Sequence, residues 1–172
     1  MESLYRPFLE LVPEAGMILD AGCGSGRDTK SFLDRGYQVT AIDASANMVE
    51  ATTRLTGQPA KQLRFQGLED QNEFDAIWAC ASVLHVPLAE IDDVLERFST
   101  ALRPGAVCYL SFKEGDSERT EGGRLFTDFT ESSLLAQLNQ QPSVVVVRIS
   151  ITNDLRPGRS EERWVNALVR KA

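Results

Sequence analysis

Residues 18–28 read Ile-Leu-Asp-Ala-Gly-Cys-Gly-Ser-Gly-Arg-Asp, a short apolar run that passes directly into a glycine-rich turn. Glycines suit such a turn because the backbone must bend sharply and approach a ligand closely, which a β-carbon would prevent. Residues compatible with a helix follow at 27–35. The stretch therefore predicts a strand, a nucleotide-binding turn and a helix, which is the opening unit of a Rossmann-type sheet.

The spacing of the glycines distinguishes two kinds of nucleotide. Gly22, Gly24 and Gly26 form Gly-x-Gly-x-Gly, but Arg27 stands where the dinucleotide fingerprint has its last glycine or an alanine. Asp20 comes two residues before the first glycine. Its carboxylate would repel a pyrophosphate and attract an ammonium or a sulfonium group. The turn disfavours a dinucleotide and favours a ligand with a cationic tail.

Asp43 is the second acidic residue of interest. It ends the next predicted strand, 21 residues after Gly22, where a carboxylate can accept hydrogen bonds from both hydroxyls of a ribose. Asp43 alone could instead cap a helix or a turn, and the glycines alone could form a tight turn without a ligand. Together with Asp20, these residues predict a site for an adenosyl group that carries a cationic amino-acid tail.

Apolar runs and helical periods alternate along the whole chain. This alternation predicts a Rossmann-like, doubly wound α/β sheet, mostly parallel, in a single domain over residues 1–172. The predicted strands are 17–20, 37–42, 63–65, 76–81, 106–112, 144–151 and 163–170, and the predicted helices are 27–35, 45–57, 87–102, 131–138 and a lead-in helix within 1–16.

Two regions depart from this alternation. The last two strands alternate apolar and polar residues, with Val145, Val147 and Ile149 on the apolar side, which predicts antiparallel strands at an edge of the sheet. Residues 113–124 are polar, contain glycines and show no periodicity. A connection of that length is usually functional, so we expect a mobile active-site loop there, whereas residues 103–105 predict a turn.

Composition excludes several functional classes. The chain has 172 residues, with 18 Lys plus Arg against 25 Asp plus Glu, and a net charge of −7. This balance disfavours a nucleic-acid partner, since nucleic-acid binding depends on clustered cations. The three cysteines lack metal-binding spacing and are typical of reduced thiols, and no metal site is predicted. We expect a cytoplasmic protein without a signal peptide or a membrane partner.

At this point the sequence resembles the class I S-adenosylmethionine-dependent methyltransferases over essentially its whole length. The matching segments are Asp-Ala-Gly-Cys-Gly-Ser-Gly at 20–26, Asp43, Phe-Asp-Ala-Ile-Trp at 74–78 and Leu-Arg-Pro-Gly at 102–105. The resemblance implies a seven-stranded sheet whose last strand is antiparallel. It also implies the cofactor S-adenosylmethionine, and a methyl group transferred by in-line displacement to a small-molecule acceptor.

The tail of the chain is similar to a narrower group. Residues 126–127, 156–159 and 164–166 resemble segments of small bacterial methyltransferases of unassigned substrate, related to those linked to tellurite resistance. The family also contacts adenine where Leu68 and Glu69 stand in this chain. Met48 is either a core residue, an adenine contact or both. The expected cofactor contacts are Asp20, Gly22, Gly24, Gly26, Asp43, Ala44, Met48, Leu68 and Glu69.

His85 and four cations are the candidates for acceptor chemistry. His85 follows the fourth predicted strand, where an imidazole could take a proton from the acceptor or could simply pack against its neighbours. Lys113, Arg119, Arg124 and Arg156 could converge on an anionic acceptor or could be solvated surface charges. We take Lys113, Arg124 and Arg156 as the expected substrate contacts.

Two other functions remain open from sequence alone. A non-catalytic adenosyl-binding protein would keep the cofactor motif without an acceptor site, because one fold serves several functions. A nicotinamide-dependent oxidoreductase would need the fingerprint that Arg27 interrupts.

Overall fold

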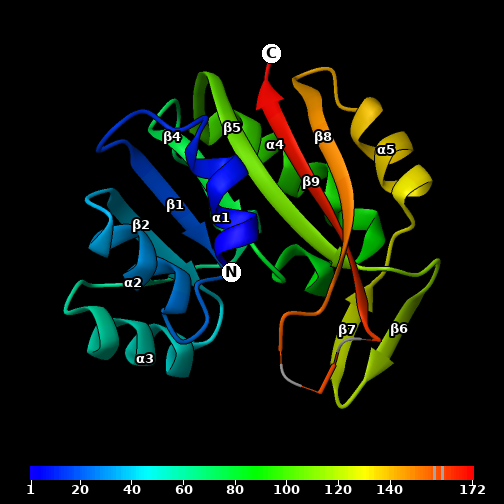
Figure 1. Ribbon diagram of the computed structural model, residues 1–172, viewed down its shortest axis with the longest axis horizontal. Coiled ribbons are helices and arrows are strands. Elements are labelled where there is room, and N and C mark those ends of the chain that lie inside the picture. Colours follow the sequence, from blue (N-terminus) through cyan, green and yellow to red (C-terminus); the bar gives the residue numbers. More distant parts are fainter. Residues whose placement is uncertain (157, 160) are drawn as a thin grey trace.

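A seven-stranded sheet forms the centre of the computed structural model, which describes residues 1–156, 158–159 and 161–172 (Figure 1). The strand order is β3-β2-β1-β4-β5-β9-β8. This confirms the predicted α/β sheet. The strands are β1 Met17–Ala21, β2 Gln38–Asp43, β3 Lys61–Gln62, β4 Phe74–Ala79, β5 Leu102–Lys113, β8 Val144–Asn153 and β9 Arg163–Lys171.

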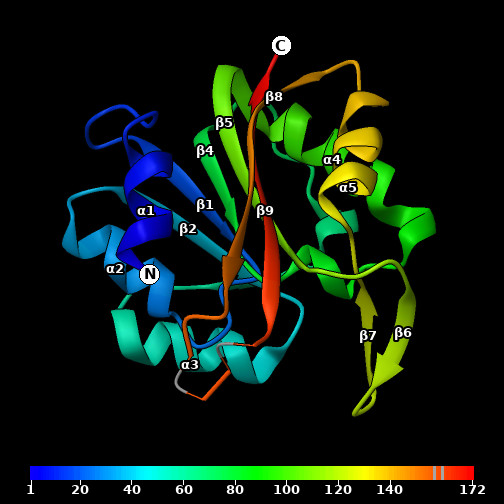
Figure 2. The ribbon, with the colours of Figure 1, turned by 45° about the vertical axis from the view of Figure 1, so that its right-hand side comes forward.

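Helices cover both faces of the sheet. Figure 2 shows α1, α2 and α3 on one side and α4 and α5 on the other. The helices are α1 Glu2–Leu9, α2 Arg27–Asp34, α3 Ala46–Thr56, α4 Ile91–Ala101 and α5 Glu131–Asn139, with short 3₁₀ turns η1 Phe65–Gly67, η2 Val83–His85 and η3 Leu88–Glu90. In the described part of the chain, no helix is both long and apolar enough to cross a membrane.

The strand order places a switch point between β1 and β4. From β1 the chain moves outward through β2 to β3, and it then returns to β4 on the other side of β1 and continues to β5. These strands are parallel, so their carboxyl ends share one edge of the sheet. Ligands of open α/β sheets bind at that edge, beside the switch point.

The last two strands form an antiparallel pair at one edge of the sheet, as predicted, but their order and the side chains on their apolar face differ in detail. β9 is antiparallel to both β5 and β8 and lies between them, so only β8 is at the edge. A register shift between Val146 and Arg148 turns the strand, leaving Val145 57% exposed and Val147 45% exposed. The apolar side assigned to these two valines was therefore wrong, and Val144 and Val146 pack against the core instead.

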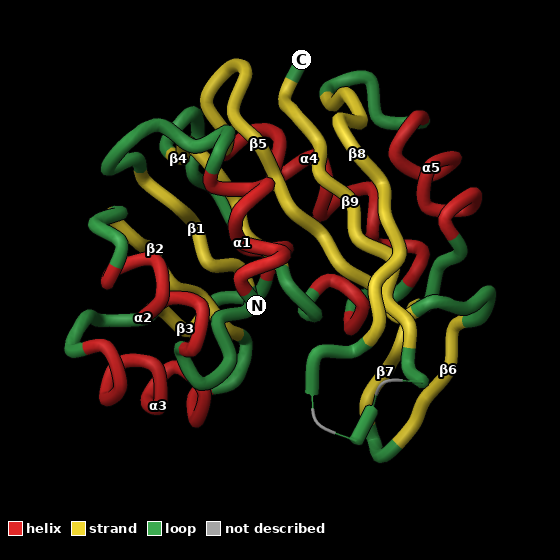
Figure 3. The backbone as a smooth tube through the Cα atoms, in the orientation of Figure 1, coloured by secondary structure: helices red, strands yellow, loops and turns green. Residues whose placement is uncertain are grey.

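Residues 113–124 are not an irregular loop. They lead into a two-stranded antiparallel hairpin of β6 Glu118–Glu121 and β7 Arg124–Thr127, which extends beyond the main sheet in Figure 3. Hydrogen bonds join the hairpin to the segment after β4: the Leu125 carbonyl to His85 Nδ1 at 2.7 Å, and Thr127 Oγ1 to the Val86 carbonyl at 2.8 Å. The hairpin is therefore hydrogen-bonded to the segment that follows β4. Its mobility stays a prediction.

Two smaller boundaries also differ. The turn predicted at 103–105 lies within the first part of β5, where the pairing with β4 shifts between Phe74 and Ala76. The third strand covers only Lys61–Gln62, instead of 63–65. The tail segment 156–159 includes Pro157, which lies outside the described residues.

A buried carboxylate joins α1 to the start of α2. Asp28 Oδ1 accepts from the Tyr5 hydroxyl at 2.6 Å, and Oδ2 accepts from Trp78 Nε1 at 2.8 Å. Arg27 donates to both oxygens through Nε and Nη2. Phe8 and Phe32 pack around Trp78 and close this cluster. The network fixes the helix that follows the glycine turn.

We expect Tyr5→Phe to destabilise the protein by about 1.5–3 kcal/mol, because Asp28 stays buried and loses one donor to a charged acceptor. Urea unfolding measures this change. Tyr37→Phe, at a half-buried tyrosine just before β2, is the matched control and should cost less. Equal losses in the two variants would contradict the role of the Tyr5–Asp28 bond.

Candidate functional site

A cavity of about 660 Å³ opens at the carboxyl edge of the sheet, beside the switch point. Its walls come from the glycine turn, the end of β2, the segment around η1, the segment after β4 and the hairpin. The lining residues are Gly22, Gly24, Asp43, Ala44, Ser45, Met48, Leu63, Arg64, Phe65, Gln66, Ala81, Ser82, His85, Val86, Pro87, Glu90, Arg124 and Leu125. Five of the predicted cofactor contacts are thus brought together: Gly22, Gly24, Asp43, Ala44 and Met48.

The three glycines of the turn differ in the space around them. Gly22 has φ +83°, and a β-carbon there would lie 2.3 Å from the β-carbon of Ser82. Gly26 is the N-cap of α2 and does not line the cavity, and a β-carbon there would lie 3.0 Å from the Thr52 Cα. Gly24 has φ +56°, and a β-carbon there would meet no protein atom within 4 Å. The turn is packed tightly at both ends and open at Gly24, which leaves room for a ligand.

Asp43 is held rigidly at the cavity wall. Its Oδ2 accepts from the Gly24 amide at 3.0 Å, and its Oδ1 accepts from the Ser45 amide at 2.8 Å. Each carboxylate oxygen has two lone pairs, so each can accept one further hydrogen bond. The arrangement can receive a pair of neighbouring hydroxyl groups, as a ribose presents them.

Asp20 does not line the cavity. It is 2% exposed, and its Oδ2 accepts from the Thr29 hydroxyl at 2.5 Å. Burial raises the pKa of Asp20 to about 7, and the neighbouring Asp28 carboxylate adds to this rise. The structure places the side chain beneath the glycine turn, so the expected contact with a cationic ligand tail is not seen there.

The predicted adenine contacts lie in the wrong place. Leu68 is 3% exposed and belongs to the core, and Glu69 is exposed and outside the cavity wall. Because β3 ends at Gln62 and η1 begins at Phe65, the preceding residues 63–66 face the cavity instead. A strand of two residues carries no periodic signal, so the sequence could not locate this wall.

His85 lines the cavity next to the hairpin. Its Nδ1 is 2.7 Å from the Leu125 carbonyl, and its ring meets the Phe126 ring edge-on at 4.9 Å. A carbonyl oxygen can only accept, so Nδ1 carries the hydrogen in the neutral ring and Nε2 keeps its lone pair. This assigns the tautomer required of a proton acceptor.

The four candidate cations do not converge. Arg124 lines the cavity, whereas Lys113 Nζ pairs with Glu162 at 3.2 Å and lies over the Phe126 ring. Arg119 pairs with Asp128 at 2.9 Å. Arg156 lines a separate hollow described below. Lys113 is therefore occupied, and the expected cluster of substrate cations was wrong.

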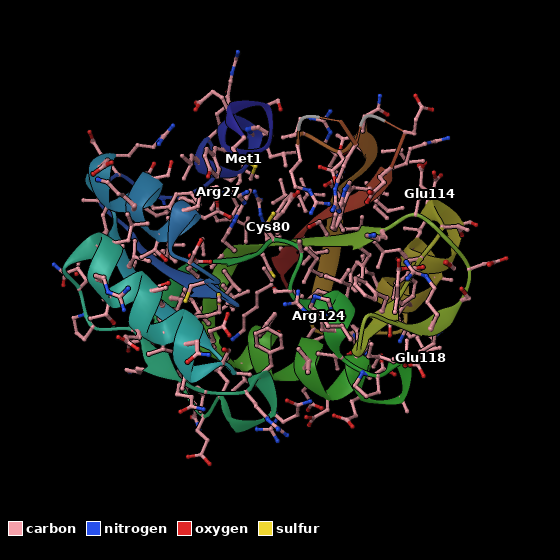
Figure 4. All side chains as sticks on the ribbon, turned by 90° about the horizontal axis from the view of Figure 1, so that it is seen from below. Met1, Arg27, Cys80, Glu114, Glu118 and Arg124 are labelled. Carbon is pink, nitrogen blue, oxygen red and sulfur yellow. The ribbon has the colours of Figure 1, made fainter. Side chains whose placement is uncertain are left out.

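Figure 4 shows the molecule from below, toward the carboxyl ends of the parallel strands. In this view Cys80 lies between Arg27 and Arg124. Arg27 and Cys80 line a second hollow of about 160 Å³. From the sequence, Arg27 only disfavours a dinucleotide, and its position in this hollow was not predicted. Within residues 1–156, 158–159 and 161–172, no three His, Cys, Asp or Glu side chains are placed to hold a metal ion.

An open α/β sheet with a cavity at the carboxyl edge of its parallel strands is the architecture of solved S-adenosylmethionine-dependent methyltransferases. A family model described as a methyltransferase domain matches residues 19–108, just over half of the chain. The chain therefore belongs to this methyltransferase family. The match runs from β1 into β5 and contains the glycine turn and Asp43.

Three known proteins illustrate the likeness. The ubiquinone biosynthesis O-methyltransferase of Xanthomonas axonopodis pv. citri (strain 306) is 31% identical over 108 residues, which cover 59% of this chain and 44% of that protein. The 1,6-didemethyltoxoflavin-N1-methyltransferase of Burkholderia thailandensis, solved with 1,6-didemethyltoxoflavin and S-adenosylhomocysteine, is 24% identical with a TM-score of 0.81, over 99% of this chain and 76% of that one. An S-adenosylmethionine-dependent methyltransferase from Methanosarcina mazei is 18% identical with a TM-score of 0.84, over 97% of each chain.

These likenesses differ in what they establish. The chain spans less than half the length of the curated relative that it matches. The two solved structures are below 25% identity and show the shared fold. S-adenosylmethionine is the cofactor of this class of protein.

We expect Asp20→Asn to change how stability depends on pH. The ordinary pKa of Asp20 is 3.8 and its pKa in the folded protein is about 7, so the unfolded chain loses this proton first. The wild type therefore loses stability as pH rises through that window, by about 1.4 kcal/mol per unit of pKa difference. Asparagine keeps an acceptor for Thr29 and carries no charge.

Urea unfolding between about pH 4 and pH 8 measures the effect. The stability of Asp20→Asn relative to wild type should increase with pH across this range. Asp34→Asn, at an exposed carboxylate, is the control. Parallel curves for wild type and Asp20→Asn would contradict the raised pKa.

Proposed function

We propose that this chain, as one domain over residues 1–172, transfers a methyl group from S-adenosylmethionine to a small-molecule acceptor by in-line displacement. The observation that carries the proposal is the constellation of Gly24 and Asp43 at the wall of the 660 Å³ cavity. The open space at Gly24 and the paired acceptor oxygens of Asp43 fit an adenosyl group.

The residues of the cavity divide into recognisable parts. Asp43 would hold the ribose hydroxyls, and Met48, Leu63 and Phe65 supply apolar surface for the adenine ring. Gly22 and Gly24 let the backbone approach the methionine part closely. When bound, S-adenosylmethionine supplies a methyl group on a sulfonium, which is already an activated donor. The chain then needs chiefly to exclude water and orient the acceptor.

His85 and Arg124 lie where an acceptor would enter. The Leu125 carbonyl accepts from His85 Nδ1, so in the neutral ring Nε2 is the nitrogen that can take a proton from an acceptor hydroxyl or amine. Arg124 is exposed at the same wall and could pair with an anionic group of the acceptor. The proposal therefore includes a small, anionic acceptor in the cytoplasm. The likeness of the tail to enzymes linked to tellurite resistance belongs to the same proposal.

The alternatives predict different binding. An oxidoreductase is disfavoured because Arg27, bound side-on to Asp28, stands at the helix start where a dinucleotide fingerprint requires a small residue. A non-catalytic adenosyl-binding protein would bind S-adenosylhomocysteine and methylate nothing. Calorimetric titration with S-adenosylhomocysteine and with NAD, followed by a panel of acceptors with labelled S-adenosylmethionine, separates the three functions.

We expect Asp43→Ala to weaken S-adenosylhomocysteine binding roughly 30- to 150-fold, because charge-assisted hydrogen bonds to two hydroxyls are lost. Calorimetric titration measures the dissociation constant. Asp116→Ala, at an exposed carboxylate before the hairpin, is the control and should bind as wild type does. Thermal unfolding shows whether the Asp43 variant is folded. An unchanged dissociation constant in a folded Asp43→Ala protein would refute the ribose assignment.

The role of His85 predicts a change in pH dependence. Once an acceptor is found whose reacting group must lose a proton, His85→Gln should lower kcat by about 10²- to 10⁴-fold. The variant should also lose the decline in activity at low pH that a general base causes. S-adenosylhomocysteine binding should not change. A variant that keeps the wild-type pH profile would show that His85 only packs against Phe126.

A further inference from the structure

The second hollow meets the large cavity at a single residue. Ala81 lines both, with Cys80 facing the smaller hollow and Ser82 the larger one. Ala81 has φ +52°, a left-handed conformation that costs an alanine about 1–2 kcal/mol. Its amide donates to Ser111 Oγ at 2.8 Å, which helps to hold this conformation. A ligand in one hollow would therefore lie next to a ligand in the other.

Two guanidinium groups line this smaller hollow. Arg27 reaches it from the start of α2, and Arg156 from the segment between β8 and β9. Each is held side-on by a carboxylate through Nε and Nη2: Arg27 by Asp28, and Arg156 by Asp154. In the part of the chain that the structure describes, Nη1 of each arginine makes no hydrogen bond. Both groups are thus oriented and keep donors for a ligand.

The carboxylates behind the arginines are fully engaged. Asp154 also accepts from the Trp164 indole at 3.0 Å and from the Arg156 amide at 2.8 Å. The hydrogen bond from Arg156 holds the pKa of Asp154 well below its usual value. Asp28 is engaged by Tyr5 and Trp78. These acids stay ionised and position the guanidiniums, so they are not available as partners for a cationic ligand.

The rest of the hollow is suited to a small, partly apolar ligand. Leu4, Tyr109 and Trp164 form part of its wall, and its volume of about 160 Å³ excludes a large molecule. The hydrogen bond to Asp154 raises the pKa of Arg156, and the charge of Arg27 is close enough to oppose this rise slightly. Each guanidinium is balanced by the carboxylate that holds it, so its remaining N–H donors, rather than a net positive charge, are what a ligand meets. A planar carboxylate matches the geometry of these donors. A dianionic phosphate would place more negative charge beside Asp154, which lines the same hollow.

We propose that Arg27 and Arg156 bind a carboxylate group in this hollow. Two sources share this chemistry. One is the amino-acid end of the cofactor, passing Ala81 from the large cavity, and this source rests on the proposed function. The other is a carboxylate on the acceptor. Asp20 lines neither hollow. Arg27 and Arg156 are cationic groups near the glycine turn that a ligand carboxylate can reach.

Calorimetric titration of Arg27→Gln and Arg156→Gln tests the proposal. If the carboxylate is the cofactor's, the variants bind S-adenosylhomocysteine ten-fold or more weakly than wild type. They bind methylthioadenosine, which lacks the amino-acid end, as wild type does. If the carboxylate is the acceptor's, ligand-observed NMR with S-adenosylhomocysteine present shows a ten-fold or greater loss for benzoate and none for benzamide. Arg54→Gln, at an exposed arginine on α3, is the matched control.

The outcomes are separable. Unchanged binding of both S-adenosylhomocysteine and benzoate overturns the carboxylate site, and so does an equal loss for methylthioadenosine or benzamide. Thermal unfolding checks both variants, and Arg156→Gln leaves the buried Tyr5–Asp28 network intact if Arg27→Gln proves unstable. A wild-type protein that binds neither adenosyl ligand refutes the proposed function, while benzoate binding in the absence of cofactor still tests the arginine site.

Discussion

Three backbone amides of the glycine turn donate to the end of β2, and the arrangement of the site depends on these bonds. The amides of Gly22 and Cys23 both reach the Ile42 carbonyl at 2.9 Å, and the Gly24 amide reaches the Asp43 carboxylate at 3.0 Å. The turn is thereby tied to the neighbouring strand instead of spreading into solvent. Gly22 and Gly24 both have positive φ, a backbone conformation that glycine adopts easily because it has no β-carbon. This conformation lets the turn reach the end of β2.

The same constraint determines where the two hollows lie. With the turn fixed against β2, Ser82 must pack over Gly22, and its hydroxyl donates to the Ala21 carbonyl at 2.7 Å. Just before Ser82, Ala81 has a left-handed conformation, and its amide donates to Ser111 Oγ of β5. One consequence is a large cavity on the Asp43 side and a smaller one on the Arg27 side, separated by one residue.

The parts of the fold that sequence could predict are those that carry a strong burial signal. β1, β4 and β5 are buried on both faces and read as continuous apolar runs, so their positions were predicted to within a few residues. The glycine turn and Asp43 were found because their chemistry is local. The cavity wall at residues 63–66 was missed because β3 has only two residues and η1 positions the residues that follow it. The bulge in β8 and the hairpin were missed because tertiary contacts, not periodicity, form them.

The site also separates into two independently built halves. The cofactor side depends on the turn, β2 and η1, which lie within the matched family region. The side that we propose for the acceptor depends on the hairpin, which docks through the Leu125 carbonyl, Thr127 and a bond from the Leu88 amide to Glu118. The matched region ends at residue 108, before this hairpin begins. Changes in the hairpin can therefore alter acceptor recognition and the orientation of His85 without disturbing the bonds that hold Gly24 and Asp43. In the proposed function, the hairpin that follows β5 would therefore vary with the acceptor, while the glycine turn and Asp43 that precede β5 would keep the adenosyl site.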